Sequence, residues 1–440
     1  MISGKFPFDL KFFIDLAKDV VPMFRKHTFM DALDVKGKKF KKYSTKYGQA
    51  KRTGKLFRQS TEFANTTAPV LTSDLLRDYK LQGTSSVGFR FGFATGAGGP
   101  ATPGITASGG STVAVGDYTF HVFNVPNSDN FTATGGPLAV EYVVAGGGGG
   151  GGSGATGNGS NHYGSAGGGA GGLRTGSFTA TADLAYIVEV GQGGSGSPAN
   201  MNNPGIAAKG NGSKIKTPTG PNYIVATGGG GGENRAARSL KPLSNPEFNT
   251  QAHGGSGGGS CMGSGYDVGE TEASPDGISP TVQGNNGGYA NSDVGFSGGG
   301  GGGAGSVGEN APGDGIAGDG GNGSPLGPTW PGSGIAPAVP APIRPNWSPE
   351  LGPTGLICGG GGGAAAPAPT TSGGSSGPGG GGKGGYGAPT GEQGGYPGKD
   401  GTGGGAGGGG QASGTGAAGG GGAGGDGIVM IRYLTSLVDP

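Results

Sequence analysis

The chain has 440 residues, of which 114 are glycine, and its apolar fraction is 32%. Globular domains contain roughly 45–50% apolar residues in a count that includes glycine, and this chain reaches that range only through its glycines, which excludes a conventional side-chain core of matching size. The glycines form contiguous runs, which also excludes collagen, because collagen needs glycine at every third position.

The net charge is only +1, but the two parts of the chain differ in sign. Residues 1–97 hold 18 Lys/Arg and 8 Asp/Glu, whereas the remainder holds 11 and 20. The remainder also holds 106 of the glycines. A basic part and an acidic part indicate two surfaces with different roles. We therefore predict a head (1–97), a Gly/Pro linker (98–109) and a glycine-rich body (110–440).

The head is predicted to be a small α+β domain. Asp9 is a candidate N-cap for an amphipathic helix that Pro22 interrupts, and residues 88–94 alternate in the manner of a strand. A basic surface in the head has these members: Lys36, Lys38, Lys39, Lys41, Lys42, Lys46, Lys51, Arg52, Lys55 and Arg58. This surface favours contact with DNA or with an acidic protein, and the alternative is a merely solvated face.

A family resemblance covers about residues 10–97. It rests on the stretch 37–44 (GKKFKKYS), a lysine-rich helix after it, and the stretch 68–78 (APVLTSDLLRD). In this order the head resembles the virion-morphogenesis proteins of tailed bacteriophages, which act in tail completion or in the neck. The chain has Ser73 where that family usually has glycine, and it lacks the family's tryptophan. The resemblance implies a ring subunit at the head–tail junction or at the top of the tail.

The body repeats one phrase, an apolar strand followed by a long glycine run. Residues 140–145, 222–227 and 355–358 each precede such a run. Strands without a long run are predicted at these segments: 119–123, 186–190 and 428–433. A flexible linker has no use for apolar strands, so the repeat favours an ordered body over disorder. We expect a small β-sandwich at one end and glycine runs packed side by side as extended polyglycine II helices, bonded through their backbones.

The body also carries a resemblance. Its phrases at 118–123, 138–146, 169–176 and 427–433 resemble the glycine-rich module of phage virion proteins. They resemble more loosely the polyglycine-sandwich adhesins at the tips of some tail fibres. These resemblances imply a surface-exposed appendage that contacts a receptor through the loops between glycine runs.

Two inserts break the glycine pattern, at 233–250 and 330–353, and are candidate receptor loops. Their cationic and aromatic residues are the candidate contacts: Arg235, Arg238, Lys241, Trp330, Arg344 and Trp347. Arginine and tryptophan are typical anchors at interfaces. The alternative is that the aromatic residues pack into a local cluster that holds a long loop in place.

The sequence contains no motif that predicts catalysis or a cofactor. Gly-x-Gly-x-x-Gly arises here from composition alone, and no phosphate-binding Gly-x(4)-Gly-Lys-Ser/Thr is present. The histidines are dispersed and lack metal-ligand spacing: His27, His121, His162 and His253. Cys261 and Cys358 each adjoin a glycine run, which leaves a disulfide between them open.

These observations together favour a non-enzymatic bacteriophage structural protein in the neck or tail of the virion. Without a signal peptide or an apolar span of about 20 residues, we expect synthesis in the host cytoplasm and no membrane insertion. The expected partners are other neck or tail proteins, copies of the chain in a ring or trimer, a bacterial receptor and DNA at the basic head. The alternatives are a connector or tail-completion ring that the body only decorates, a surface-glycan depolymerase, and a DNA-binding protein with a disordered tail.

Overall fold

The computed structural model describes most of the glycine-rich body, and every structural statement below refers to that part. The described residues are 104–124, 128–154, 164–199, 206–220, 222–234, 250–261, 268–273, 275–277, 282–290, 297–313, 315–326, 330, 355–365, 372–387, 393–411 and 418–438. The head lies outside them, so its α+β fold, its basic surface and its boundary with the body stay predictions.

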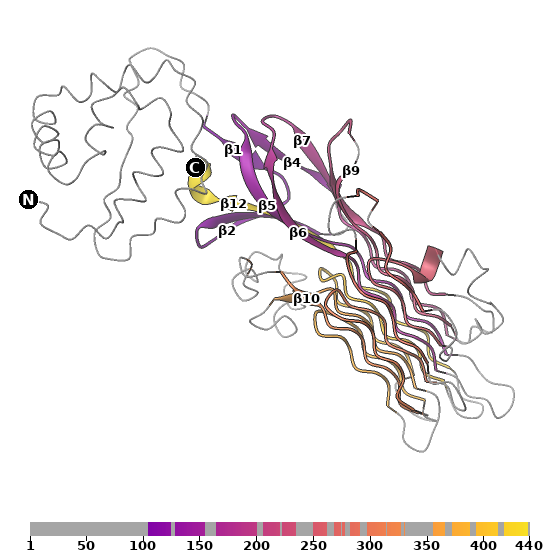
Figure 1. Ribbon diagram of the computed structural model, residues 1–440. Coiled ribbons are helices and arrows are strands. Elements are labelled where there is room, and N and C mark those ends of the chain that lie inside the picture. Colours follow the sequence, from indigo (N-terminus) through magenta and orange to yellow (C-terminus); the bar gives the residue numbers. More distant parts are fainter. Residues whose placement is uncertain are drawn as a thin grey trace, which may run out of the picture. The chain divides into compact units, whose positions relative to one another are not determined.

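Two five-stranded antiparallel sheets pack face to face at one end of the body (Figure 1). The first sheet has the order β1 (Thr106–Ser108), β4 (Ser128–Thr134), β7 (Ala185–Glu189), β8 (Ser213–Lys216) and β9 (Asn222–Ala226). The second has the order β2 (Ser111–Val115), β3 (Tyr118–Phe123), β12 (Ile428–Leu434), β5 (Leu138–Ala145) and β6 (Leu173–Ala180). A short pair, β10 (Ser324–Pro325) with β11 (Leu356–Ile357), and a 3-10 turn, Thr435–Leu437, complete the named elements.

The central strand of the second sheet, β12, is buried on both faces. In β12, Val429 and Ile431 pack against the first sheet, whereas Ile428 and Met430 face a second cluster that includes Trp330 and Ile357. Successive side chains of a strand point to opposite faces, so a strand covered on both sides needs a continuous apolar run. This requirement explains why β12 is apolar at every position from Ile428 to Ile431.

The sandwich strands continue into the glycine runs without changing partners. β5 leads into the run 146–154, and β6 and β12 are each preceded by a run, at 164–172 and 418–427. The Gly146 amide donates to Gly172 O (3.0 Å) and the Gly148 amide to Gly425 O (2.9 Å). The same strand pairs therefore stay neighbours beyond the sheet, and Figure 1 shows the runs extending side by side from the sandwich.

The hydrogen bonds of the run 146–154 repeat every three residues. Its amides donate in turn to the runs 164–172, 206–212 and 418–427, for instance Gly149 to Gly169 (2.8 Å) and Gly151 to Gly422 (2.9 Å). Its carbonyls accept in turn from three further runs, through the amides of Gly229, Gly194 and Ala406 and then Gly232, Ser197 and Gly409. The run thus has six neighbours. A repeat of three without bonds inside the run is the signature of an extended polyproline-II-type helix.

The array excludes side chains sterically. A Cβ on Gly148 would lie 2.0 Å from Gly404 O, and one on Gly151 would lie 1.9 Å from Gly407 O. Real Cβ atoms essentially never approach closer than 3.0 Å, so a substitution there must push neighbouring runs apart. Glycine is required at these positions because the backbones approach so closely.

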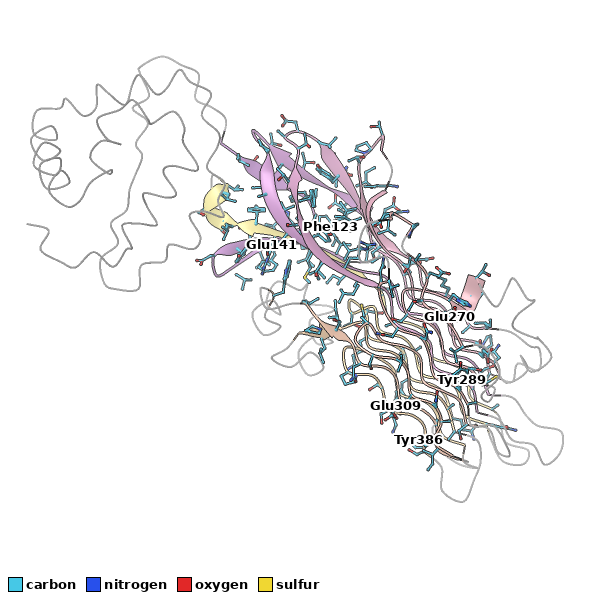
Figure 2. The ribbon with its side chains drawn as sticks, viewed as in Figure 1. Phe123, Glu141, Glu270, Tyr289, Glu309 and Tyr386 are labelled. Atoms are coloured by element: carbon cyan, nitrogen blue, oxygen red, sulfur yellow. The ribbon has the colours of Figure 1, made fainter. Side chains whose placement is uncertain are left out.

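At the outside of the array, polar side chains take the place of a missing neighbour. Asn310 Oδ1 accepts from the Tyr289 amide (2.8 Å), and Asp319 Oδ1 accepts from the Ser375 amide (2.6 Å). Figure 2 shows Tyr289, Glu309 and Tyr386 along the array, whereas Phe123 lies in the sandwich. Polar side chains at the surface of the array therefore accept hydrogen bonds from backbone amides that have no neighbouring run to bond to.

The prediction of an all-β body is confirmed. The strands predicted at 119–123, 140–145, 186–190 and 428–433 correspond to β3, β5, β7 and β12, and they lie in the predicted sandwich. Several strands were not predicted: β1, β2, β4, β6, β8 and β10. Within the described part of the body, no helix is long and apolar enough to span a bilayer.

Candidate functional site

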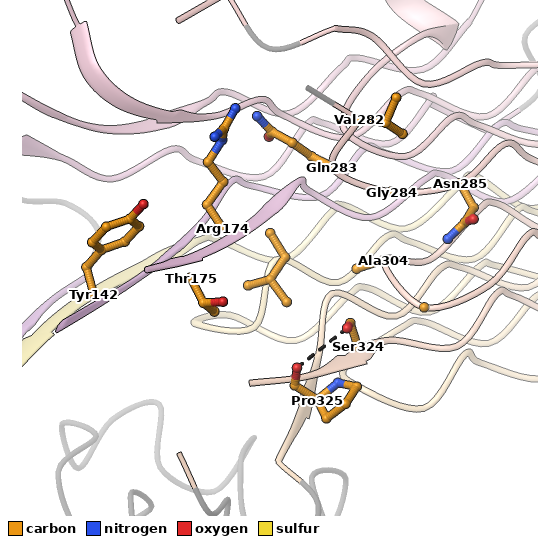
Figure 3. Close-up of a pocket in the computed structure, with 12 residues that line it drawn as sticks. Tyr142, Arg174, Thr175, Val282, Gln283, Gly284, Asn285, Ala304, Ser324 and Pro325 are labelled. Atoms are coloured by element: carbon orange, nitrogen blue, oxygen red, sulfur yellow. Dashed lines mark hydrogen bonds between the residues drawn. The ribbon is translucent and has the colours of Figure 1, made fainter. Parts of the chain in front are cut away.

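A cavity of about 340 Å³ opens where the sandwich meets the array (Figure 3). The sandwich contributes Tyr142, Arg174 and Thr175 to its lining, and the array side contributes Gln283 and Ser324. Most of the surface that lines this cavity is polar, whereas pockets for small ligands are usually lined mainly by apolar side chains.

A buried ion pair forms one side of this junction. Arg174, in β6, donates from Nη2 to Asp276 Oδ1 at 2.9 Å, and the two side chains are 2% and 0% exposed. The second carboxylate oxygen of Asp276 accepts from the Val225 amide at 2.7 Å. A buried charge needs such partners, because removing it from water is otherwise costly. The pair joins the two sheets to the segment at 275–277.

The side-chain amide of Gln283 bonds to the backbone at the end of β9 in the way that a neighbouring strand would. Its Oε1 accepts from the Thr227 amide (2.9 Å), and its Nε2 donates to Val225 O (2.8 Å). These backbone groups lie where β9 passes into the glycine run 227–234. A Cβ on Gly172 would lie 2.3 Å from Gln283 Oε1, so the side chain fills this position tightly.

Arg174 and Gln283, two polar side chains of the lining, hold the walls of the cavity together through hydrogen bonds. Its lining includes neither a carboxylate nor a histidine or cysteine. Glycoside hydrolysis uses a pair of carboxylates, and this lining lacks that pair. Across the described ranges, no group of three His, Cys, Asp or Glu side chains is placed to hold a metal ion.

A second polar layer lies at the opposite end of the glycine runs. The Glu233 carboxylate accepts from Ser260 Oγ (2.9 Å) and from the Cys261 amide (2.8 Å). Cys261 Sγ donates to Asn234 O (3.0 Å), and Asn234 Oδ1 accepts from the Ser153 amide (2.9 Å). All five residues are buried.

This distal layer joins the ends of three runs. The runs 146–154, 227–234 and 254–261 all finish there, so the connections that follow them leave the array at one level. Those connections are residues 155–163, 235–249 and 262–267, which lie outside the described residues. The layer fixes the points from which they start.

Trp330 is the one predicted receptor contact that falls within the described residues, and it is buried. Its side chain is 3% exposed, and its ring packs edge-on against Phe120 at a centroid distance of 5.8 Å. The Arg432 guanidinium lies 3.9 Å from the Trp330 centroid and 4.2 Å from the Tyr118 centroid. Trp330 is therefore a core residue, which favours the alternative that this aromatic packs into a local cluster.

The other predicted receptor contacts lie outside the described residues: Arg235, Arg238, Lys241, Arg344 and Trp347. The ten basic residues of the head lie outside them as well.

Cys261 and Cys358 are both buried and do not form a disulfide with each other. Burial raises the pKa of the Cys358 thiol, which keeps it protonated and unreactive. His121 is buried too, and its Nδ1 donates to Gly109 O at 2.6 Å while Nε2 lies 3.3 Å from the Tyr433 hydroxyl. These contacts give His121 a structural role.

Two charged residues in the strands were missed by the sequence reasoning. Arg432 interrupts the apolar strand β12, and its Nε donates to Glu141 on the paired strand β5 at 2.9 Å. Arg174 likewise lies in β6. A cation inside a strand that is otherwise apolar signals a paired buried charge, and this signal was present for Arg432.

Comparison with known proteins assigns the body to a family. No curated protein matches the chain. The family described as a glycine-rich domain matches residues 124–434, which is well over half of the chain and includes the array and the sandwich strands from β4 onward. The chain therefore belongs to the glycine-rich domain family.

Proposed function

We propose that the chain is a non-enzymatic structural protein of a tailed-bacteriophage virion, in which the body projects as a rigid appendage that contacts the host surface. Its glycine runs act as polyglycine II helices packed into a stiff scaffold. The head, residues 1–97, docks the chain to the neck or tail. This proposal also draws on the resemblances in both parts of the sequence.

The observation that carries the proposal is the distal layer. Three runs end there in one hydrogen-bonded level, about 25 Å from the sandwich at the rise of an extended threefold helix. Their connections therefore emerge together, at the end opposite the strands. One of these connections, 235–249, contains Arg235, Arg238 and Lys241. Loops held on a rigid scaffold are the usual carriers of binding residues.

Stiffness follows from the bonding in three directions. A strand in a sheet is hydrogen-bonded to at most two neighbouring strands, whereas the run 146–154 is hydrogen-bonded to six neighbouring runs. Bending such an array breaks hydrogen bonds between several runs at once. An appendage that transmits a contact from its tip to the particle benefits from this property.

The test measures binding of the purified full-length protein to host cells. Labelled protein should bind cells of a susceptible strain, and the triple variant Arg235→Ala, Arg238→Ala, Lys241→Ala should bind at least about tenfold more weakly if these residues are hot spots. Lys209→Ala is the control, because Lys209 lies on the array and pairs with Glu272 at 2.5 Å.

Two outcomes would redirect the proposal. If the wild-type protein binds no susceptible strain although immunolabelling finds it on the virion, the body only decorates a connector or tail-completion ring. If incubation with purified host glycan releases new reducing ends, the chain is a depolymerase.

A further inference from the structure

A groove of about 570 Å³ lies on one side of the array, away from the junction cavity. It runs beside two antiparallel glycine-rich runs, 381–387 and 393–399. The Tyr396 amide donates to Lys383 O (2.9 Å), and the Lys399 amide donates to Gly380 O (2.8 Å). The groove is therefore built on a fixed pair of neighbouring runs.

Apart from Pro397, the non-glycine residues of these runs recur every third position. Lys383 and Tyr386 follow this spacing in one run, and Gln393, Tyr396 and Lys399 follow it in the other. In an extended threefold helix, residues three apart lie on the same side, about 9 Å from one another. Each run thus presents a column in which a lysine and a tyrosine are neighbours.

The side chains of the columns are held in place. Lys383 Nζ donates to the Tyr386 hydroxyl and lies 4.6 Å from the centroid of the Tyr386 ring. Tyr396 is 38% exposed, and Pro397 follows it in the lining of the groove. Figure 2 shows Tyr386 toward the end of the array that lies away from the sandwich. An exposed ring with lysine side chains in the same groove is a ready surface for a ligand with an apolar face and a negative charge.

We propose that this groove binds a saccharide that carries carboxylate groups, such as a uronic acid unit of a bacterial surface polymer. Tyr396 and Pro397 pack against the apolar face of the sugar ring, and Lys383 and Lys399 pair with its carboxylate. Asp400, also in the lining, accepts a hydrogen bond from a sugar hydroxyl. The inference rests on the proposed function, since it names a ligand class for the host-contacting body.

The charge of the body favours an acidic saccharide over a nucleic acid. Residues 98–440 hold 11 Lys/Arg against 20 Asp/Glu. Binding to a phosphate backbone depends on many cations that neutralise successive phosphates. The groove offers two lysines, and Asp400 stands beside them. Two lysines can pair with the carboxylates of one or two uronate units, whereas a nucleic acid presents a longer row of phosphates.

The experiment titrates full-length protein with defined oligosaccharides by calorimetry. The probes are oligogalacturonate, oligomannuronate and, as an uncharged comparison, maltohexaose. We expect binding of at least one of the two uronates and at least tenfold weaker binding of maltohexaose. Tyr396→Ala should weaken uronate binding at least tenfold, and Lys383→Gln should weaken it while Lys383→Arg retains it.

Two controls separate a local effect from a folding effect. Tyr289→Ala removes another surface tyrosine of the array outside the groove and should leave the affinity unchanged. Circular dichroism and amide exchange should match wild type for all the variants.

Three outcomes of the titration would contradict binding of an acidic saccharide in the groove. If neither uronate binds, or if Tyr289→Ala weakens binding as much as Tyr396→Ala, the proposal is wrong. A single-stranded oligonucleotide that binds more tightly than the uronates would overturn it in favour of nucleic acid. Because no cells are used, failure here leaves the cell-binding test of the appendage unaffected.

Discussion

The sandwich and the array are both buried, but different groups fill them. In the sandwich, side chains such as Phe131, Leu138 and Ile215 are at most 1% exposed and form the core. In the array, the buried residues are mostly glycines whose backbones touch directly. Burial in the sandwich therefore removes apolar surface from water, whereas burial in the array mainly exchanges one set of hydrogen-bond partners for another.

This difference means that the array depends on the sandwich. Ordering one residue costs about 1–2 kcal/mol of backbone entropy, and glycine loses the most. A typical hydrogen bond returns only about 0.5–1.5 kcal/mol net. The strand pairs of the sandwich continue as neighbouring runs, so its hydrophobic core sets the register of the first glycines. We infer that the two regions fold together.

The largest expected effect comes from adding one methyl group to the middle of the array. Gly151→Ala places a Cβ 1.9 Å from Gly407 O, a contact that only separation of the runs can relieve. Overpacking a tight interior costs about 1–3 kcal/mol and sometimes more, and we expect the upper end, about 3 kcal/mol. Urea unfolding measures the loss, and amide exchange should locate it in the runs around 146–154.

Gly394→Ala is the matched control for this change. A Cβ there would meet only Gly420 O, at 3.8 Å, which is ordinary contact. Its effect should stay within about 0.5 kcal/mol of wild type. Equal losses in the two variants would contradict the close packing of the array.

The junction should show an intermediate effect, because it combines a packed environment with charge. Asp276→Asn leaves the buried Arg174 without its counter-charge, so we expect a loss of about 2–3 kcal/mol, somewhat below the usual cost of breaking a buried pair. Glu272→Gln breaks the pair with Lys209, in which the side chains are 22% and 33% exposed, and should cost less than about 1 kcal/mol. Thermal unfolding of the two variants compares them, and a smaller loss for Asp276→Asn than for Glu272→Gln would contradict the role of the pair.

The strands that the sequence predicted are those with continuous apolar content. β5 and β12 are rich in β-branched residues, and the glycine run after β5 marks its end. β4 (SDNFTAT) and β6 (LRTGSFTA) were missed because polar residues interrupt their apolar ones, so neither strand contains a continuous apolar run. The sandwich followed from the strong strands, whereas its edges and its pairing order required the structure.

Contacts between distant segments limited prediction of the site. Trp330 looks like an exposed anchor in a proline-rich insert, but it is covered by Phe120 and Arg432, which are far apart in the sequence and paired on neighbouring strands. Gly151 and Gly394 both lie among glycines in the sequence, although only the first is enclosed by backbone. A period of three in the residues around Lys383 and Tyr396 was visible, but it acquires meaning only once the runs are known to be threefold helices.

The smallest expected effect is a pH dependence that belongs to the sandwich. His121 faces Phe131 across the sandwich, with ring centroids 5.2 Å apart. Burial lowers the pKa of His121 below its ordinary value of 6.5, and the hydrogen bond to Gly109 O only partly opposes this shift. The folded state therefore takes up the proton less readily than the unfolded state.

Stability should accordingly fall as the pH drops below about 6.5, and the fall should level off once the pH is below the folded pKa of His121. Each unit by which the pKa of His121 is lowered on folding corresponds to about 1.4 kcal/mol of stability lost at acidic pH. His121→Gln should flatten this part of the pH profile of the urea midpoint, whatever it does to the absolute stability. Asp426 works in the opposite sense at more acidic pH, because burial raises its carboxyl pKa in the folded state. If the urea midpoint of His121→Gln still falls as steeply as that of wild type between pH 6.5 and 5, His121 does not cause the acid sensitivity. If Gly151→Ala shows the same slope as wild type, the acid sensitivity belongs to the sandwich and not to the array.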